Sequence, residues 1–334
     1  MLETSGLSGI RLYEPGALTL VAGAGTPLAE VEAALAEANQ RLAFEPMDHR
    51  AVLGTGGAPT IGGVVAANVS GPRRVQAGAC RDFLLGVRFV DGRGVAVKNG
   101  GRVMKNVTGY DLVKLLCGSW GTLGVLSEVS LKVLPAAETQ AALRIDCGGL
   151  DAAVAAMSAA LGSPWEVSGA ASDGAGVVSL RIEGFAESVR YRAERLAGVL
   201  AKFGAVEMLD DPEAHWVGLR DLAAFHGLPG DLWRISVKPG EAPGVVAGLG
   251  AERVQLDWGG GLIWALAEPG SDLRARMGVA GHATLMRAGA ATRARLGMFH
   301  PEPPALAAIS AGLRAKFDPR GILNPGLMRA AAEA

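Results

Sequence analysis

One ten-residue segment of this chain is too rich in glycine for a regular helix or strand. Residues 54–63 read Gly-Thr-Gly-Gly-Ala-Pro-Thr-Ile-Gly-Gly, and small residues continue to Gly71. Glycine has no Cβ, so it enters tight turns and allows close approach to the backbone. The segment is therefore either a structural loop or a row of free N–H groups that suits a pyrophosphate. Composition alone favours neither interpretation. It lacks the lysine of a P-loop, which argues against a nucleoside-triphosphate site.

Two further segments have a similar character. Residues 105–112 (Lys-Asn-Val-Thr-Gly-Tyr-Asp-Leu) precede an apolar stretch typical of a helix, and residues 118–125 (Gly-Ser-Trp-Gly-Thr-Leu-Gly-Val) follow it. Tyr110 and Asp111 have an equally simple interpretation as a packing residue and a helix cap. Glycine makes up 48 of the 334 residues, about twice the usual share. This distribution predicts a protein that surrounds a ligand with main chain.

Charge and cysteine content exclude several classes of protein. With 32 basic and 33 acidic side chains, the chain lacks the basic excess that nucleic-acid binding requires. Its three cysteines are far apart, which argues against a disulfide framework and against a zinc or iron–sulfur site, and the five histidines show no paired spacing. We therefore predict no metal. The N-terminus lacks a signal peptide and no apolar run reaches 18 residues, so we expect a cytoplasmic protein, peripheral to the inner membrane only through partners.

Hydrophobic periodicity predicts the elements of the first 135 residues. Residues 18–22 alternate as a strand, and Thr26 is placed to cap a helix over 27–38 whose first residue is Pro27. The Gly23-x-Gly25 pair resembles a dinucleotide-binding turn, but Leu28 occupies the third glycine position, so a plain strand–turn–helix is favoured. A hairpin over 86–98 and a strand over 123–133 follow.

The composition changes near residues 136–139, where we place a domain boundary. Beyond it, strand and helix patterns alternate, with helices expected over 150–161, 186–201 and 212–224. This alternation predicts a second domain rich in βαβ units, an open sheet with helices on one face. A last helix has an apolar face formed by Leu306, Ile309, Leu313 and Phe317.

The glycine-dense segments, taken in order and with their spacing, resemble the vanillyl-alcohol-oxidase-type (PCMH-type) FAD-binding family. The motifs are Thr-Ile-Gly-Gly at 60–63 with Asn68 and Gly71, the segment 105–112, and the loop 118–124. Residues 317–326 (Phe-Asp-Pro-Arg-Gly-Ile-Leu-Asn-Pro-Gly) are similar to the closing segment of that family. Through Trp216, residues 219–221, 232–234 and 257–260, the chain is most similar to the E subunits of bacterial glycolate oxidases.

The resemblance implies an α+β fold with a PCMH-type FAD-binding domain in two subdomains and an α/β cap domain. Residues 1–135 would form the FAD-binding domain, 136–300 the cap, and 301–334 a segment that returns to the FAD-binding domain. It also implies noncovalent FAD, held by Gly57, Thr60, Ile61, Gly62, Gly63, Asn68 and Gly71, by Gly121, Thr122, Gly124 and Val125, and by Asn324.

Two departures from the family pattern affect these expectations. Relatives carry a further βαβ unit with a pyrophosphate loop before the segment that matches residues 2–10, so the FAD-binding domain is expected to be N-terminally incomplete. The histidine-rich metal motif of catalytic 2-hydroxy acid dehydrogenases is also missing, and Trp120 stands where those relatives often have an acidic residue.

The resemblance implies an FAD-dependent oxidoreductase subunit of a glycolate oxidase (glycolate dehydrogenase) complex. It would oxidise glycolate or a similar small 2-hydroxy acid to the 2-oxo acid, with a catalytic D-type FAD subunit and an iron–sulfur F-type subunit as partners. The alternative is a noncatalytic scaffold with a vestigial flavin site. Arg220, Arg234 and His226 are candidates for binding the carboxylate or accepting the proton, but a structural role is favoured for each, and no catalytic residue is assigned.

Overall fold

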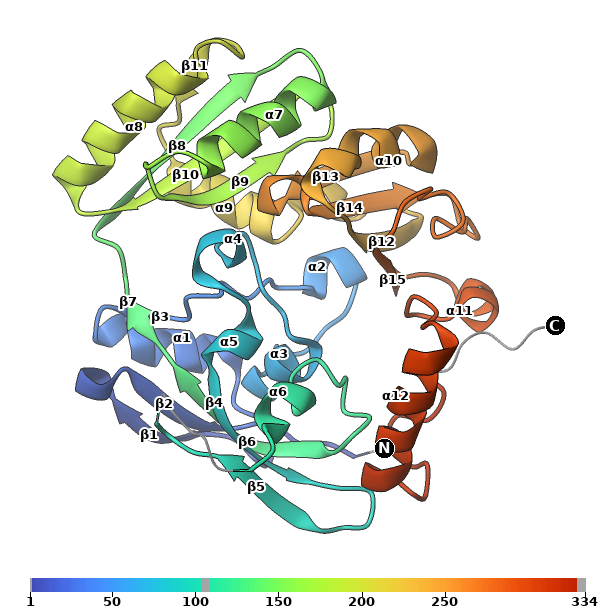
Figure 1. Cartoon of the computed structure of the whole chain (residues 1–334). Helices are drawn as coiled ribbons and strands as arrows, with labels where there is room; N and C mark the ends of the chain where they lie inside the picture. Colours follow the sequence, from blue (N-terminus) through green and yellow to red (C-terminus); the bar gives the residue numbers. More distant parts are fainter. Residues whose placement is uncertain (1, 104–108, 329–334) are drawn as a thin grey trace.

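The computed structural model describes residues 2–103 and 109–328, and its strands form two large sheets (Figure 1). The first sheet is antiparallel, in the order β1-β2-β6-β4-β5. Its strands are β1 (Ile10–Glu14), β2 (Thr19–Gly23), β4 (Leu84–Val90), β5 (Ala96–Gly100) and β6 (Val125–Lys132). The strand near 18–22, the hairpin and the strand near 123–133 are confirmed. The edge strand β1 was not predicted, because none of its residues is fully buried.

The helices of this first domain are short and pack between its sheet and the second domain. They are α1 (Leu28–Glu37), α2 (Arg50–Leu53), α3 (Ile61–Ala67), α4 (Arg74–Ala77), α5 (Cys80–Phe83) and α6 (Leu112–Leu116). Helix α1 buries Leu28, Val31 and Leu35, as its periodicity predicts. The prediction that Thr26 caps α1 is wrong. Its hydroxyl accepts from the Gly9 N–H at 2.9 Å and donates to the Gly23 carbonyl at 2.7 Å, closing the turn before the helix.

The second sheet has eight strands in the order β11-β8-β10-β9-β13-β14-β12-β15. They are β8 (Thr139–Asp146), β9 (Val167–Ser172), β10 (Val177–Gly184), β11 (Val206–Met208), β12 (Asp231–Ser236), β13 (Arg253–Asp257), β14 (Leu262–Ala267) and β15 (His282–Arg287). Both β8 and β9 pair antiparallel with β10, so they run parallel to each other, joined by a helix. The predicted βαβ units are therefore split units, each with a third strand inserted between its two strands.

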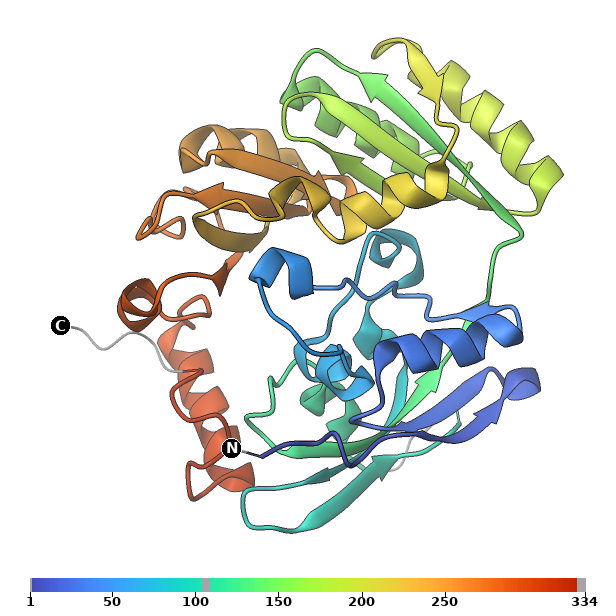
Figure 2. The same cartoon turned by 180° about the vertical axis from the view of Figure 1, so that it is seen from behind.

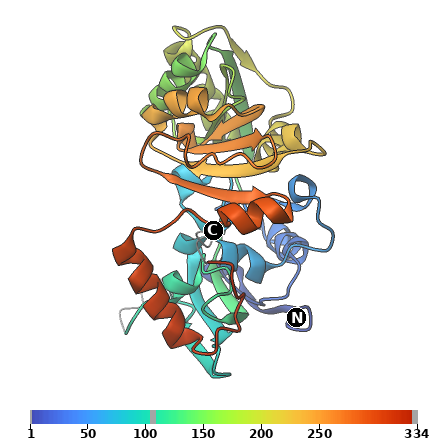
Figure 3. The ribbon, with the colours of Figure 1, turned by 90° about the vertical axis from the view of Figure 1, so that its right-hand side faces the viewer.

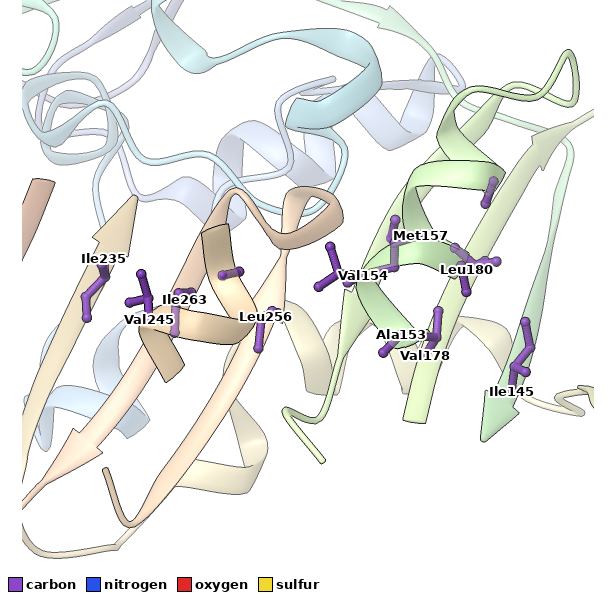
Figure 4. Close-up of a cluster of buried hydrophobic side chains, with 14 of the residues drawn as sticks. Ile145, Ala153, Val154, Met157, Val178, Leu180, Ile235, Val245, Leu256 and Ile263 are labelled. Carbon is purple, nitrogen blue, oxygen red and sulfur yellow. The ribbon is translucent and has the colours of Figure 1, made fainter. Parts of the chain in front are cut away.

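Three helices cover one face of this sheet: α7 (Leu150–Leu161), α8 (Ala186–Leu200) and α10 (Ala242–Leu249). Figure 4 shows side chains of α7 and α10 meeting the sheet, with Met157 against Leu180 and Val245 beside Ile263. Helix α9 (Pro212–Arg220) lies on the opposite face, where Trp216 packs on Ala142 and Ala171 (Figure 2). The predicted helix over 212–224 ends earlier because Leu222 adopts a left-handed conformation, with φ 57°.

The chain then returns to the first domain. After α11 (Ala290–Leu296), α12 (Pro304–Phe317) runs along that domain (Figure 3). The Phe317 ring lies 6.1 Å from that of Phe89, and the Gly92 N–H donates to the Phe317 carbonyl at 2.8 Å. The expected apolar face of this helix is only partly used, because Leu306 and Ile309 remain exposed. The short strands β3 (Gln40–Arg41) and β7 (Leu134–Pro135) pair where the chain crosses to the second domain.

A buried ion-pair network joins the two domains. The Arg181 guanidinium of β10 donates to both carboxylate oxygens of Glu45, at 2.9 and 2.8 Å. Arg73 and Arg41 of the first domain reach Glu183 of β10, at 2.9 and 2.6 Å. Burial alone would raise the pKa of Glu45, but Arg181 and Arg73 outweigh it and hold that pKa below its usual range. We call these five residues the interdomain network.

Candidate functional site

A cavity of about 440 Å³ lies between the two domains. The first domain contributes the glycine-dense loop from Thr55 to Thr60, helix α3 and residues as far as Arg74. The second contributes Arg234 of β12, Trp264 of β14, and Thr284 and Met286 of β15. We call this space the interdomain cavity. Both domains supply its walls, so it exists only when they are docked.

The structure divides the predicted site residues into two groups. Thr60, Gly63 and Asn68 line the interdomain cavity. Thr122 and Asn324 instead line a separate cavity of about 180 Å³ beside the C-terminal segment. The other predicted residues line neither cavity: Gly57, Ile61, Gly62, Gly71, Gly121, Gly124 and Val125. Of the segment 105–112, residues 105–108 lie outside the described residues.

The backbone amides at the start of α3 are engaged within the chain. The Ile61 N–H donates to the Thr26 carbonyl at 3.0 Å, and the Gly62 N–H to the Ala24 carbonyl at 2.8 Å. The Gly63 N–H donates to the Thr60 hydroxyl at 3.2 Å. The expectation that amides 61–63 hold a pyrophosphate therefore needs correction, because each has an internal acceptor.

Free amides occur a few residues earlier in the same loop. No described residue accepts a hydrogen bond from the N–H groups of Gly56, Gly57 or Ala58, and Gly56 and Ala58 line the cavity. Gly57 has φ +87°, a conformation that favours glycine, and residues 56–58 are exposed to solvent. Three consecutive unengaged donors suit an anion. Of these three residues, Gly57 is among those predicted from the sequence to hold the cofactor.

Asn68 presents a fixed hydrogen-bond donor to the cavity. Its side-chain oxygen accepts from the Arg81 N–H at 3.0 Å and faces the Cys117 thiol at 3.6 Å. Because the Arg81 N–H can only donate, the Asn68 atom that faces it must be the side-chain oxygen. The side-chain NH₂ group of Asn68 is therefore the end without a partner among the described residues. Asn68 also ends α3 with φ 51°, which asparagine tolerates better than most residues.

Several predicted glycines are required by chain packing. A Cβ on Gly62 would lie 2.5 Å from the Ala24 carbonyl oxygen, and one on Gly124 would lie 2.5 Å from the Phe89 ring. At Gly71 it would collide with the Glu45 carbonyl. These positions admit a neighbouring chain segment, so their glycine content is explained without a ligand.

The residues around 120 form a turn closed by the C-terminal segment. The Asn324 side chain donates to the Trp120 carbonyl at 2.7 Å, beside Gly121, whose φ is +70°. The Thr122 hydroxyl donates to the Ser119 carbonyl at 2.7 Å. Trp120 lines the interdomain cavity, and its ring meets Phe299 edge-on at 5.4 Å. The loop thus contributes an aromatic wall, which the sequence did not predict.

Two of the three candidate catalytic side chains have structural partners. Arg220 pairs with Asp221 at 2.6 Å, and the His226 ring contacts the Asp221 carbonyl at 2.8 Å. Contacts of this kind are what the structural role favoured for both residues predicts. Arg234 differs, because it lines the cavity and none of the described carboxylates lies within 4 Å of it.

His49 is a cavity residue that sequence reasoning missed. Its ring lies 6.4 Å from that of Trp264. Burial lowers the pKa of His49 to about 4, and the positive charge of Arg234 acts in the same direction. The imidazole is therefore uncharged near pH 7, with a lone pair that can accept a proton. An isolated histidine before a glycine-dense loop carries no sequence signal of this role.

The architecture and cavity define a two-domain FAD-binding oxidoreductase. The sequence profile described as "FAD binding domain" matches residues 1–100. Glycolate oxidase subunit GlcE of Escherichia coli (strain K12) is 39% identical over 328 residues, covering 96% of this chain and 85% of that protein. The chain belongs to the family of glycolate oxidase subunit GlcE, whose cofactor class is FAD.

Other relatives match a smaller share of the chain. Glycolate oxidase subunit GlcD of Bacillus subtilis (strain 168) is 38% identical over 30% of this chain and 21% of its own length. D-lactate dehydrogenase of Anaerostipes hadrus is 41% identical over 29% of this chain and 20% of its own length. Among solved structures, alkyldihydroxyacetonephosphate synthase has a similar fold, with a TM-score of 0.66 at 16% identity, covering 96% of this chain and 66% of that one.

The residues of the cavity fit FAD. The unengaged amides of Gly56 and Ala58 suit phosphate oxygens, and the free Asn68 donor suits an acceptor atom of a flavin ring. The walls supplied by Trp120 and Trp264 suit a flat aromatic ligand.

Proposed function

We propose that this chain is the FAD-binding subunit of a glycolate oxidase complex that oxidises glycolate or a similar small 2-hydroxy acid to the 2-oxo acid. FAD binds noncovalently in the interdomain cavity, with Gly56–Ala58, Thr60, Gly63 and Asn68 around it. A catalytic D-type FAD subunit and an iron–sulfur F-type subunit complete the complex and carry the electrons onward. Similarity to GlcE along nearly the whole chain supports this assignment.

The observation that carries the proposal is the pairing of flavin-type donors with an unpaired cation in one cavity. Asn68 offers a free amide donor from the first domain, and Arg234 offers an unpaired guanidinium from the second. A site that oxidises a 2-hydroxy acid needs both a flavin position and a positive charge for the carboxylate.

The bound FAD would supply the electron acceptor for the α-carbon hydride. This chain's own residues would orient the acid and receive its hydroxyl proton. His49 is the proposed proton acceptor, because its imidazole lines the cavity and is neutral near pH 7. A carboxylate bound near Arg234 would offset the guanidinium charge. This would raise the pKa of His49 and make the imidazole a stronger base.

We place the protein in the cytoplasm, associated with the inner membrane only through the complex. No helix in residues 2–103 and 109–328 combines the length and apolar character needed to cross a bilayer.

Flavin content tests the proposal. The chain is purified alone and together with its partner subunits, and the visible absorbance spectrum of each preparation is recorded. We expect flavin bands at about one FAD per copy of this chain, and anaerobic bleaching when glycolate is added to the complex. Colourless preparations in both cases would refute the flavin-binding proposal.

A scaffold without its own flavin is the second candidate, and the internal bonding of amides 61 and 62 favours it. Under this alternative the chain is colourless alone, and the yellow complex carries only the flavin of the D-type subunit. His49→Asn in the complex separates the two: it slows flavin reduction by glycolate if this chain is catalytic, and leaves it unchanged if this chain is a scaffold.

A further inference from the structure

Two arginines, one from each domain, meet at a single indole beside the cavity. The Arg74 Cζ lies 4.3 Å from the ring centroid of Trp258, and the Arg234 Cζ lies 5.1 Å from it. The Trp258 indole N–H donates to the Gly71 carbonyl at 3.0 Å, which fixes the ring against the first domain. Both arginines line the interdomain cavity. We call Arg74 and Arg234 the arginine pair.

Neither guanidinium of the pair has a carboxylate partner among the described residues. Three other arginines of the interface do: Arg73 and Arg181 bind Glu45, and Arg41 binds Glu183. For Arg234 the only charged neighbour that affects its pKa is Arg74, a like charge. Two unpaired cations in a concave, partly dry site create a strongly positive potential, and such a site attracts an anion.

The surroundings favour a small organic anion over a phosphate. Arg234 pairs across the sheet with Trp264 and Thr284, and the apolar side chains of Met286 and Met298 line the same cavity. The backbone donors that suit phosphate oxygens, at Gly56 and Ala58, come from the first domain, whereas Arg234 comes from the second. A carboxylate attached to a short carbon chain satisfies both the guanidinium and these apolar neighbours.

We propose that the arginine pair is the carboxylate-binding site of this protein, with Arg234 donating hydrogen bonds to the carboxylate and Arg74 adding a second positive charge. Because the pair comes from both domains, the site is assembled only across the docked interface. The inference rests on the proposed function for the identity of its ligand as a 2-hydroxy acid.

Oxamate, a carboxylate that cannot be oxidised as a 2-hydroxy acid, serves as the probe. Isothermal titration calorimetry is run on the full chain as purified and after saturation with FAD. Loss of a charge-assisted hydrogen bond predicts that Arg234→Met weakens oxamate binding by about tenfold to a hundredfold. Arg74→Met is expected to weaken it less, because it removes charge without a direct bond, and Arg234→Lys to restore part of the affinity. The surface variant Arg293→Met is the matched control and is expected to bind like the wild type.

The outcomes separate this inference from the proposed function. If neither Arg74→Met nor Arg234→Met changes the affinity, or if the wild type does not bind oxamate, the inference is wrong even where FAD binds and glycolate bleaches it. If inorganic pyrophosphate displaces oxamate and the Arg234→Met variant loses FAD instead, the pair belongs to the cofactor phosphates. Arginine-dependent oxamate binding by a chain that carries no FAD would support the carboxylate site while refuting the flavin proposal.

Discussion

Replacing Arg234 with methionine is expected to make the protein more stable while it removes the proposed ligand site. Burial, reinforced by the charge of Arg74, lowers the pKa of Arg234 from 12.5 to about 10. One pKa unit corresponds to about 1.4 kcal/mol, so keeping this side chain charged costs the folded state about 3 kcal/mol. Its side chain is half-buried, and methionine forfeits a cation–π contact of about 1 kcal/mol. The net expected gain in the free energy of unfolding is therefore about 1–2 kcal/mol.

The sign of this effect follows from proton linkage. When folding lowers the pKa of a base, the folded state is destabilised by the full amount at any pH where the base is protonated in both the folded and the unfolded chain. For Arg234 this holds below about pH 10. The stabilisation by Arg234→Met is thus expected to be constant across pH 6–8. Urea unfolding followed by tryptophan fluorescence measures it as a higher midpoint with an unchanged slope.

Arg274 provides the matched control with the opposite sign. Its guanidinium donates to four carbonyl oxygens: those of Ala283, Leu296, Gly297 and Met298. Arg274→Met leaves these carbonyls short of donors and is expected to destabilise the protein by about 2 kcal/mol or more. If Arg234→Met is as destabilising as Arg274→Met, then Arg234 is a structural residue and the reasoning about an unpaired cation fails.

Four further variants test other parts of the structure. Glu45→Gln removes the charge opposite buried Arg181, and is expected to lower the free energy of unfolding by about 3 kcal/mol, which an unchanged urea midpoint would contradict. Gly62→Ala is expected to lower yield or melting temperature because its Cβ has no space, whereas Gly56→Ala, with nothing within 4 Å, is expected to match the wild type in thermal melts. Burial raises the pKa of Asp257 to about 7, so the contribution of this carboxyl group to stability is expected to fall as pH rises from 4 to 7. Asp257→Asn lacks this contribution. In urea titrations, the free energy of unfolding of the variant relative to the wild type is therefore expected to be higher at pH 8 than at pH 5.

Sequence patterns predicted the elements of this fold better than their arrangement. The helix expected over 150–161 has those bounds, because its apolar positions recur at helical spacing and glycines lie on either side. The split βαβ units were not foreseen, since strand pairing is a long-range property and the order β8-β10-β9 leaves no local trace. Thr26 illustrates a local error: a threonine before a proline looks like a cap, but the tertiary contact with Gly9 takes its hydroxyl.

The candidate site was predicted in part for a similar reason. The glycine-dense loop and Asn68 could be located because glycine and asparagine mark unusual backbone conformations. Which amides are free depends on contacts with residues 24–26, and no pattern within the loop encodes them. Arg234 and His49 come from separate parts of the chain, and only the docking of the two domains makes one an unpaired cation and the other a neutral base.

The interdomain network also restricts how a ligand reaches the cavity. Swinging the second domain away would separate Arg181 and Glu45, and breaking a buried pair of this kind costs several kcal/mol. The contact between Trp120 and Phe299 is a single aromatic edge, which side-chain rotation can open at far lower cost. Ligand exchange is thus expected to use side-chain and loop movements on the nanosecond-to-microsecond timescale, with the two domains remaining docked.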